Sequence, residues 1–207
     1  MKASLALRGA LSTLVLLVGC RGVDESTASQ NLVVVHETLP GGGGEDAGLL
    51  PNDRVIAFHR AANPPSNPKP FVAPVTSCLD LALLEIEQAP RGAVELVIDR
   101  PRPNGTFSRL RLPIPADEWR IRLRPETART PADRAWESHL RAQIDAAARN
   151  VESAEAAYRE VEAWARSVHD DRLLALVLIN RTRFRLEMQH FDDALADITE
   201  ALALRRK

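Results

Sequence analysis

The chain has 207 residues, of which 45% are hydrophobic, and it carries 27 basic and 28 acidic residues. This length allows two small domains, and this share of apolar residues supports a packed core, which excludes a chain that is disordered throughout. The formal net charge of −1 excludes the strongly basic composition that nucleic-acid-binding domains use to hold phosphates.

The first residues predict an export signal. Lys2 and Arg8 precede an apolar run from Leu11 to Val18, which is too short to cross a bilayer as a helix, since that takes ~20 apolar residues. A charged start, a short apolar run and small residues at its end are typical of a secretory signal peptide. We therefore expect residues 1–19 to be removed on export.

The last residues of this segment, Leu17-Val18-Gly19-Cys20, resemble the lipobox of bacterial lipoproteins. The resemblance implies cleavage before Cys20 and attachment of fatty acids such as palmitate to its thiol and amine. Several acyl chains hold a protein on a membrane durably. An ordinary signal peptide with an incidental cysteine is the alternative. Because Arg21 follows the cysteine, where enteric bacteria use Asp for inner-membrane retention, the periplasmic face of the outer membrane is favoured.

Residues 20–30 are small and polar and predict a flexible tether. Residues 31–116 predict a domain that mixes strands with short helices. A short helical turn is expected over 45–50, and Ser77, with Asp80 three residues later, is expected to start a helix that runs to about Gln88. Runs rich in β-branched residues or alternating in polarity predict strands over 32–35, 54–59, 94–99 and 106–114.

Turn residues separate these strands. Asn104-Gly105 predicts a tight hairpin turn between the last two, because both residues tolerate positive φ. The segment 61–74 holds five prolines and is expected to be an irregular, exposed loop.

The order of these elements resembles a bacterial PDZ domain, and the run that carries the resemblance is Glu45-Asp46-Ala47-Gly48-Leu49-Leu50-Pro51-Asn52-Asp53-Arg54-Val55-Ile56. PDZ domains bind an extended peptide as an added strand beside an edge strand. The resemblance implies a groove between an edge strand at 32–36 and the helix at 77–88. Core packing is the alternative for the apolar positions. The implied lining residues are Leu32, Val33, Val34, Val35, His36, Leu79, Leu83 and Ile86.

One part of the PDZ pattern is missing. A loop before the first strand normally holds the carboxylate of the peptide, and no Gly-apolar-Gly pattern is present there. The glycine run 41–44 follows the strand instead and predicts a flexible turn. We therefore expect the carboxylate pocket to be degraded even if the groove exists.

The remaining residues predict a linker, 117–132, and a helical region, 133–207. Trp119 to Leu123 is a candidate short strand within the linker. Thr130-Pro131-Ala132-Asp133 predicts a helix start, because a hydroxyl cap, an early proline and an acidic third residue suit that position. Apolar periodicity predicts four helices, over 133–149, 152–168, 172–188 and 192–204.

The last helix pair resembles a tetratricopeptide repeat (TPR) through Phe191-Asp192-Asp193-Ala194-Leu195-Ala196-Asp197 and the later Ile198, Ala201 and Leu202. The resemblance implies that Ala194 and Ala201 let the two helices pack closely and that Phe191 fills their turn. An unrelated helical bundle is the alternative. About three repeats are normally needed for stability. Because only two pairs are expected here, either the array packs on the PDZ-like domain or on a partner, or it is incomplete and the chain is the front part of a longer protein. Without such a neighbour, Leu173, Leu176, Leu195 and Leu202 would be underfilled.

The predicted fold class is therefore α+β: a small PDZ-like, partly open β-barrel or sandwich with two helices, followed by an all-α array of TPR-like hairpins. No metal or cofactor site is predicted, because the five histidines are scattered and no phosphate-binding or nucleophile motif is present. Cys78 lies in an apolar run and is expected to be a buried thiol.

These features predict a lipid-anchored, non-enzymatic adaptor of the cell envelope that binds a protein or peptide partner and no nucleic acid. Two other interpretations stay open. One is a regulatory or substrate-presenting component of an envelope protease system, and the other is an enzyme of unrecognised type.

Overall fold

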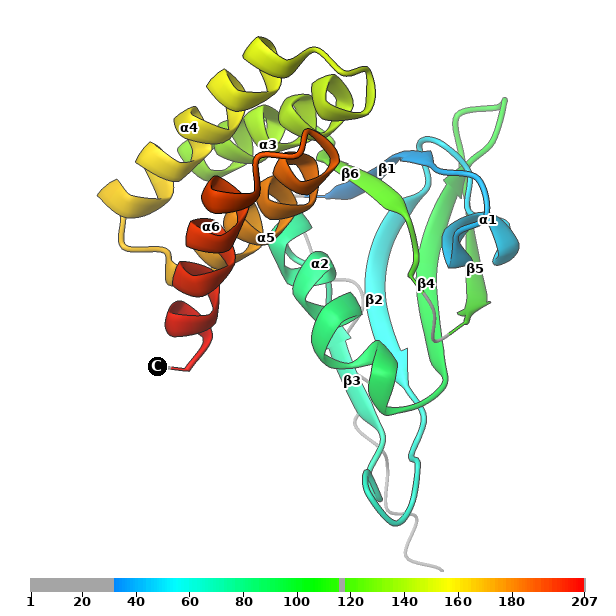
Figure 1. Ribbon diagram of the computed structural model, residues 1–207. Coiled ribbons are helices and arrows are strands. Elements are labelled where there is room, and N and C mark those ends of the chain that lie inside the picture. The colour runs from blue at the N-terminus through cyan, green and yellow to red at the C-terminus, as the bar shows by residue number, and fades with distance from the viewer. Residues whose placement is uncertain (1–31, 116–117, 207) are drawn as a thin grey trace, which may run out of the picture.

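The computed structural model describes residues 32–115 and 118–206; the predicted signal peptide, Cys20 and the tether lie outside the described residues. Within this part, a six-stranded antiparallel sheet is followed by four long helices, and the helix α2 lies between the sheet and the later helices (Figure 1). The expected combination of α and β elements is confirmed at this level.

The strands of the sheet pair in the order β5-β4-β2-β1-β6, and β3 pairs with β2 outside this path. All the pairings are antiparallel. Side chains on one face of β1, β2 and β4 are fully buried and pack with Trp119, which forms the core of this half. The strands are β1 (Val33–Thr38), β2 (Arg54–Arg60), β3 (Phe71–Pro74), β4 (Val94–Pro101), β5 (Phe107–Ile114) and β6 (Ile121–Pro125).

One strand lies where an irregular loop was expected. Phe71–Pro74 forms β3, paired with β2 from Arg60↔Phe71 to Ala57↔Pro74. The prediction of irregular structure over the whole of 61–74 is therefore wrong. Proline is tolerated on a strand that pairs on one side only, because its missing N–H then costs no ladder hydrogen bond.

The helix α2 (Cys78–Glu87) begins as predicted. The Ser77 hydroxyl accepts a hydrogen bond from the backbone N–H of Asp80 at 3.0 Å, and the 3₁₀ turn η1 (Ala89–Arg91) follows the helix. Cys78 is buried, as expected, and this burial raises the pKa of its thiol. The hairpin β4–β5 is confirmed as well, with Gly105 at φ +81 in its turn.

The glycine run is a packing site. Gly43 and Gly44 begin the short helix α1 (Gly43–Asp46), and their N–H groups donate to the carbonyls of Glu118 at 3.0 Å and Trp119 at 2.9 Å. A Cβ on Gly44 would lie 2.6 Å from Cγ1 of Ile121. The run therefore allows the chain before β6 to lie directly against α1.

This packing predicts a stability effect. Gly44→Ala should lower the free energy of unfolding by about 1–3 kcal/mol, because the added methyl overlaps Ile121 and the structure must shift. Gly48→Asn is the matched control, since Gly48 has open space around it and asparagine tolerates its φ of +75. Urea unfolding measures both. Equal stability of Gly44→Ala and the wild type would contradict the packing role.

The helical half contains α3 (Pro131–Ala147), α4 (Val151–Ser167), α5 (Asp171–Glu187) and α6 (Phe191–Arg205). Thr130 and Asp133 form the expected capping box at the start of α3. Ala194 and Ala201 are each 1% exposed, as expected for close packing, whereas Phe191 is 62% exposed and does not fill the turn. In the part of the chain that the structure describes, no helix is long and apolar enough to span a membrane.

Candidate functional site

The strand predicted to form a peptide groove has no free edge. β1 pairs with β2 on one side, at Val33 and Val34, and with β6 on the other, from Val33 to Thr38. Val33, Val34 and Val35 are buried, Leu32 is half-buried and His36 is exposed. The prediction that residues 32–36 form an edge strand is wrong, because β6 returns from far along the chain to occupy that edge.

The edge strand on this side of the sheet is therefore β6, and the helix α3 packs against it. The indole Nε1 of Trp136 donates to the carbonyl of Leu123 at 2.8 Å, and Trp136 is itself buried. Pro125 has no N–H to offer an added strand. Arg122 donates to Glu37 and to the carbonyl of Gln143 on α3. Strand addition beside β6 would have to displace α3.

The side chains of α2 that were predicted to line the groove differ in their burial. Leu83 is buried in the core, Leu79 packs at its margin, and Ile86 is 45% exposed. Core packing is thus the better account of Leu83. A cavity of about 260 Å³ lies between β3, α2 and α5, and it is smaller than typical small-molecule sites. Its lining includes Ala73, Pro74, Asp80, Leu83, Glu87 and Arg172.

Ion pairs join the sheet half to the helical half. Arg183 on α5 lies 3.0 Å from Glu118, and Arg205 on α6 lies 3.0 Å from Glu87 on α2. The buried hydrogen bond from Trp136 to Leu123 also joins the two halves, on the side of the molecule that carries α2 (Figure 1), whereas the two ion pairs are largely exposed and stabilise the contact only weakly. The helical hairpins are therefore a part of the fold's packing and not a separate appendage.

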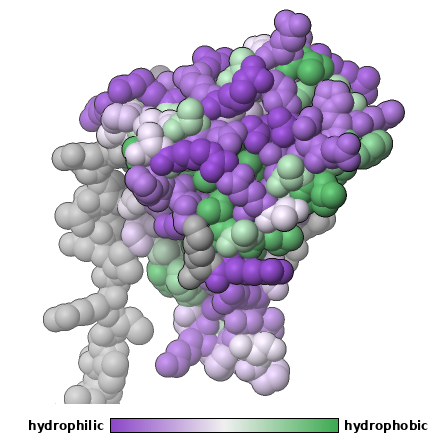
Figure 2. Space-filling view, turned by 60° about the vertical axis from the view of Figure 1, so that its left-hand side comes forward, coloured by the Kyte–Doolittle hydropathy of each residue, from purple (hydrophilic) through white to green (hydrophobic). Residues whose placement is uncertain are grey.

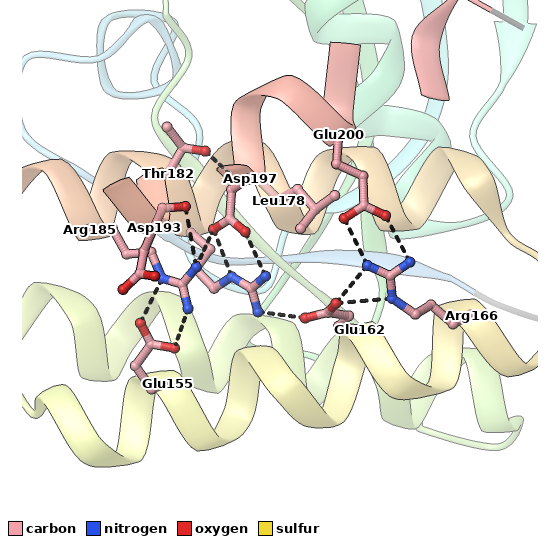
Figure 3. A network of polar contacts seen from close by, with 10 residues as sticks. Glu155, Glu162, Arg166, Leu178, Thr182, Arg185, Asp193, Asp197 and Glu200 are labelled. Carbon is pink, nitrogen blue, oxygen red and sulfur yellow. Dashed lines mark hydrogen bonds and ion pairs between the residues drawn. The ribbon is translucent and has the colours of Figure 1, made fainter. Parts of the chain in front are cut away.

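A buried ionic network connects α4, α5 and α6 (Figure 3). Asp197 on α6 accepts two hydrogen bonds from Arg181, at 2.7 and 2.8 Å, and one from Arg185 at 2.9 Å. Arg181 also pairs with Glu162, and Arg185 pairs with Glu155. These charges satisfy one another, so the network is a structural clamp and not an open binding site.

The network also shifts the titration of its carboxylates. Burial raises the pKa of Glu162, but hydrogen bonds from Arg166 and Arg181 outweigh it and hold the pKa below its usual value. Arg166 bridges Glu162 to Glu200 on α6, which extends the clamp along the helix (Figure 3). No pattern in the sequence marks this network, because its members are spread over three helices.

His139 on α3 lies fully inside the helical half. Its Nε2 is 3.1 Å from Nδ2 of Asn180 and 3.3 Å from Nε2 of Gln143, while its Nδ1 has no hydrogen-bond partner. Burial lowers the pKa of His139 to about 4, so the ring is neutral at pH 7. Over residues 32–115 and 118–206, no group of three or more His, Cys, Asp or Glu side chains could hold a metal ion.

The most distinctive surface feature lies on α6. Phe191, Leu195 and Leu202 are 62%, 65% and 51% exposed, and Ile198 between them is half-buried. Their spacing of four, three and four residues places them in one row on the helix, which we call the α6 stripe. Figure 2, which brings the helical side forward, shows green apolar patches within a mainly purple surface. Grouped exposed apolar residues mark interaction sites.

The sequence does not predict the α6 stripe as a binding site, although Leu195 and Leu202 are among the apolar positions expected to need a neighbour. These residues fit the TPR-like hairpin that the sequence predicts. The periodic signal could have identified the stripe, since four apolar positions exceed what one buried face requires.

The chain matches no protein-family model, no curated protein and no solved structure. The assignment of function therefore depends on the geometry described above.

Proposed function

We propose that this chain is a lipoprotein of the cell envelope, attached to a membrane through an acylated Cys20, which works as a protein–protein interaction adaptor and not as an enzyme. In this proposal the sheet half is a PDZ-like platform, the helical half is a TPR-like array, and the α6 stripe is the surface that contacts a protein.

The exposure of the α6 stripe carries this proposal. Covering apolar surface releases about 25 cal/mol for each Å² removed from water, so an exposed row of large apolar side chains favours association. The same helix buries Ala194, Asp197 and Ala201 against the rest of the array. The stripe is thus an exposed apolar face, separate from the face of α6 that packs against the rest of the array.

Local features support the PDZ-like and TPR-like parts of the proposal. The turn at Ala47-Gly48-Leu49 precedes β2, and the φ of +74 at Asn52 matches the turn geometry that the PDZ pattern needs there. In the last hairpin, buried Ala194 and Ala201 support the TPR-like interpretation. Because the edges beside β1 and β6 are closed, the adaptor proposal now depends on the helical surface and not on a peptide groove.

The anchor has its own test. Cells fed an alkyne-tagged palmitate should label the wild-type chain, and Cys20→Ala should lose the label and leave the membrane fraction. Cys78→Ala is the matched control and should keep both, because the buried Cys78 thiol is not an acylation site in this proposal. A label that persists in Cys20→Ala would contradict the anchor.

The contact surface is tested by photo-crosslinking in intact envelopes. A photoreactive residue at Leu195 should give covalent protein adducts, because the account places a protein against this side chain. The same residue at Arg159, which is exposed on α4, should give few adducts. Equal yields at the two positions, or no adduct at Leu195, would contradict the assignment of the α6 stripe.

A further inference from the structure

We infer that the partner of the α6 stripe is a second copy of this chain, whose α6 lies antiparallel to the first. This inference rests on the proposed function, because it names the protein that covers the stripe. The distribution of charge along α6 favours self-association.

Charge changes sign from one end of α6 to the other. Asp192 and Asp193 lie in its first turn, and Arg205 and Arg206 lie at its last turn and cap. Two such helices laid parallel would place like charges side by side. Laid antiparallel, they place the acidic start of one beside the basic end of the other, and their helix dipoles are also opposed.

An antiparallel pair centred between Ile198 and Thr199 brings matching side chains together. Counting outward from this centre, Leu195 of one copy lies opposite Leu202 of the other, and Asp192 lies opposite Arg205 and one residue from Arg206. A twofold axis repeats each of these contacts, so every favourable pair occurs twice. In this arrangement the apolar stripes face each other, and the charged ends of the two α6 helices are complementary.

The groups at the two ends are available for this role. Asp192 and Arg206 are exposed, and within the described residues neither takes part in an ion pair. A helix of 15 residues is about 22 Å long, so the contact is small for a protein interface. We therefore expect a weak dimer, which attachment of both copies to one membrane surface would strengthen by raising their effective concentration.

Sedimentation equilibrium tests the dimer with the chain carrying Cys20→Ser, so that no acyl group contributes. This protein should form dimers as its concentration rises, and Leu195→Glu should stay monomeric to at least about tenfold higher concentration. Leu50→Glu is the matched control, since Leu50 is exposed on the sheet half. It should dimerise like the parent.

Charge reversal tests the antiparallel arrangement. Asp192→Lys and Arg206→Glu should each weaken dimerisation about tenfold, since each places like charges together twice in the pair. The double variant should recover the parental constant within about threefold, because its ion pairs are restored with the signs exchanged. Circular dichroism checks that all the variants keep their helices.

Three results would overturn the inference: a parent that is monomeric at every concentration, a Leu195→Glu variant that dimerises like the parent, or a double variant no better than the single ones. If the parent is monomeric while the photoreactive residue at Leu195 labels a different protein, self-association fails and the adaptor proposal stands. If Leu195 labels nothing, both fail.

Discussion

Asp197→Ala is expected to lower the free energy of unfolding by about 3–5 kcal/mol, because it removes an anion that neutralises the buried Arg181 and the half-buried Arg185. Arg181 and Asp197 are each 6% exposed in their side chains, and Arg185 shares the same carboxylate. Without Asp197, the charge of Arg181 would stay buried with only Glu162 beside it. The substitution should weaken the packing of α6 on α5, since Asp197 accepts the hydrogen bonds that join α6 to Arg181 and Arg185.

Urea unfolding followed by circular dichroism measures this effect. Asp193→Ala is the matched control, because Asp193 lies on the same helix with an exposed side chain, and it should cost less than about 1 kcal/mol. A loss in Asp197→Ala no larger than the loss in the control would show that the network does not hold the last hairpin.

The second large effect concerns pH and the buried His139. Its pKa is about 4 in the folded chain against an ordinary value of 6.5, so on acidification the unfolded chain binds a proton before the folded chain does. Stability is therefore lost as the pH falls from 6.5 towards 4, and the full loss is about 3 kcal/mol.

Glu85 acts in the opposite direction. Burial raises its pKa to about 7 from 4.5, against the lowering effect of a hydrogen bond from the backbone N–H of Trp119. The folded chain thus holds a proton that the unfolded chain has lost, and this stabilisation disappears as the pH rises from 4.5 through 7. Between pH 4.5 and 6.5 the two contributions largely cancel in the wild type.

Single variants separate the two contributions to stability. In Glu85→Gln only the His139 contribution remains, so the free energy of unfolding should increase from pH 4.5 to 6.5. In His139→Gln only the Glu85 contribution remains, so the free energy of unfolding should decrease over the same interval. Urea unfolding at a series of pH values measures both slopes. Parallel profiles for the two variants and the wild type would contradict the assigned protonation states.

Local signals in the sequence predict most of the elements. Ser77 and Thr130 cap helices where their hydroxyls indicate, and Asn104-Gly105 lies in the turn of its hairpin. These features depend on interactions between residues a few positions apart, so a short stretch of sequence is enough to predict them. The helices of the second half begin and end within about two residues of the predicted positions for the same reason.

Long-range pairing is what local patterns could not predict. β1 begins as a continuous run of valines, and nothing in that run shows that β6, about ninety residues later, covers its edge. The sequence around Trp136 indicates only a core residue of α3. Its hydrogen bond to Leu123 depends on how the two halves pack, which a local pattern does not show. The wrong groove assignment follows from this missing information.

The sequence does not predict the ionic network, and it predicts the α6 stripe only in part, for a related reason. Arg181 and Asp197 look like ordinary surface charges on helices, and only the packing of α4, α5 and α6 buries them. Phe191 and Leu195 look like core residues of a repeat, and only the fold shows that no described element covers them. Burial is a property of the assembled chain and not of a short pattern.

Cysteine accessibility in intact envelopes tests most directly whether a protein covers the α6 stripe. Single cysteines at Leu195 and Leu202 would be compared with cysteines at Ala196 and Ala203, which are exposed on another side of the same helix. The account predicts that a maleimide reacts slowly at Leu195 and Leu202 in envelopes, and as fast as at the alanines once detergent and dilution separate the partners. Equal, rapid labelling at all four positions in intact envelopes would contradict it.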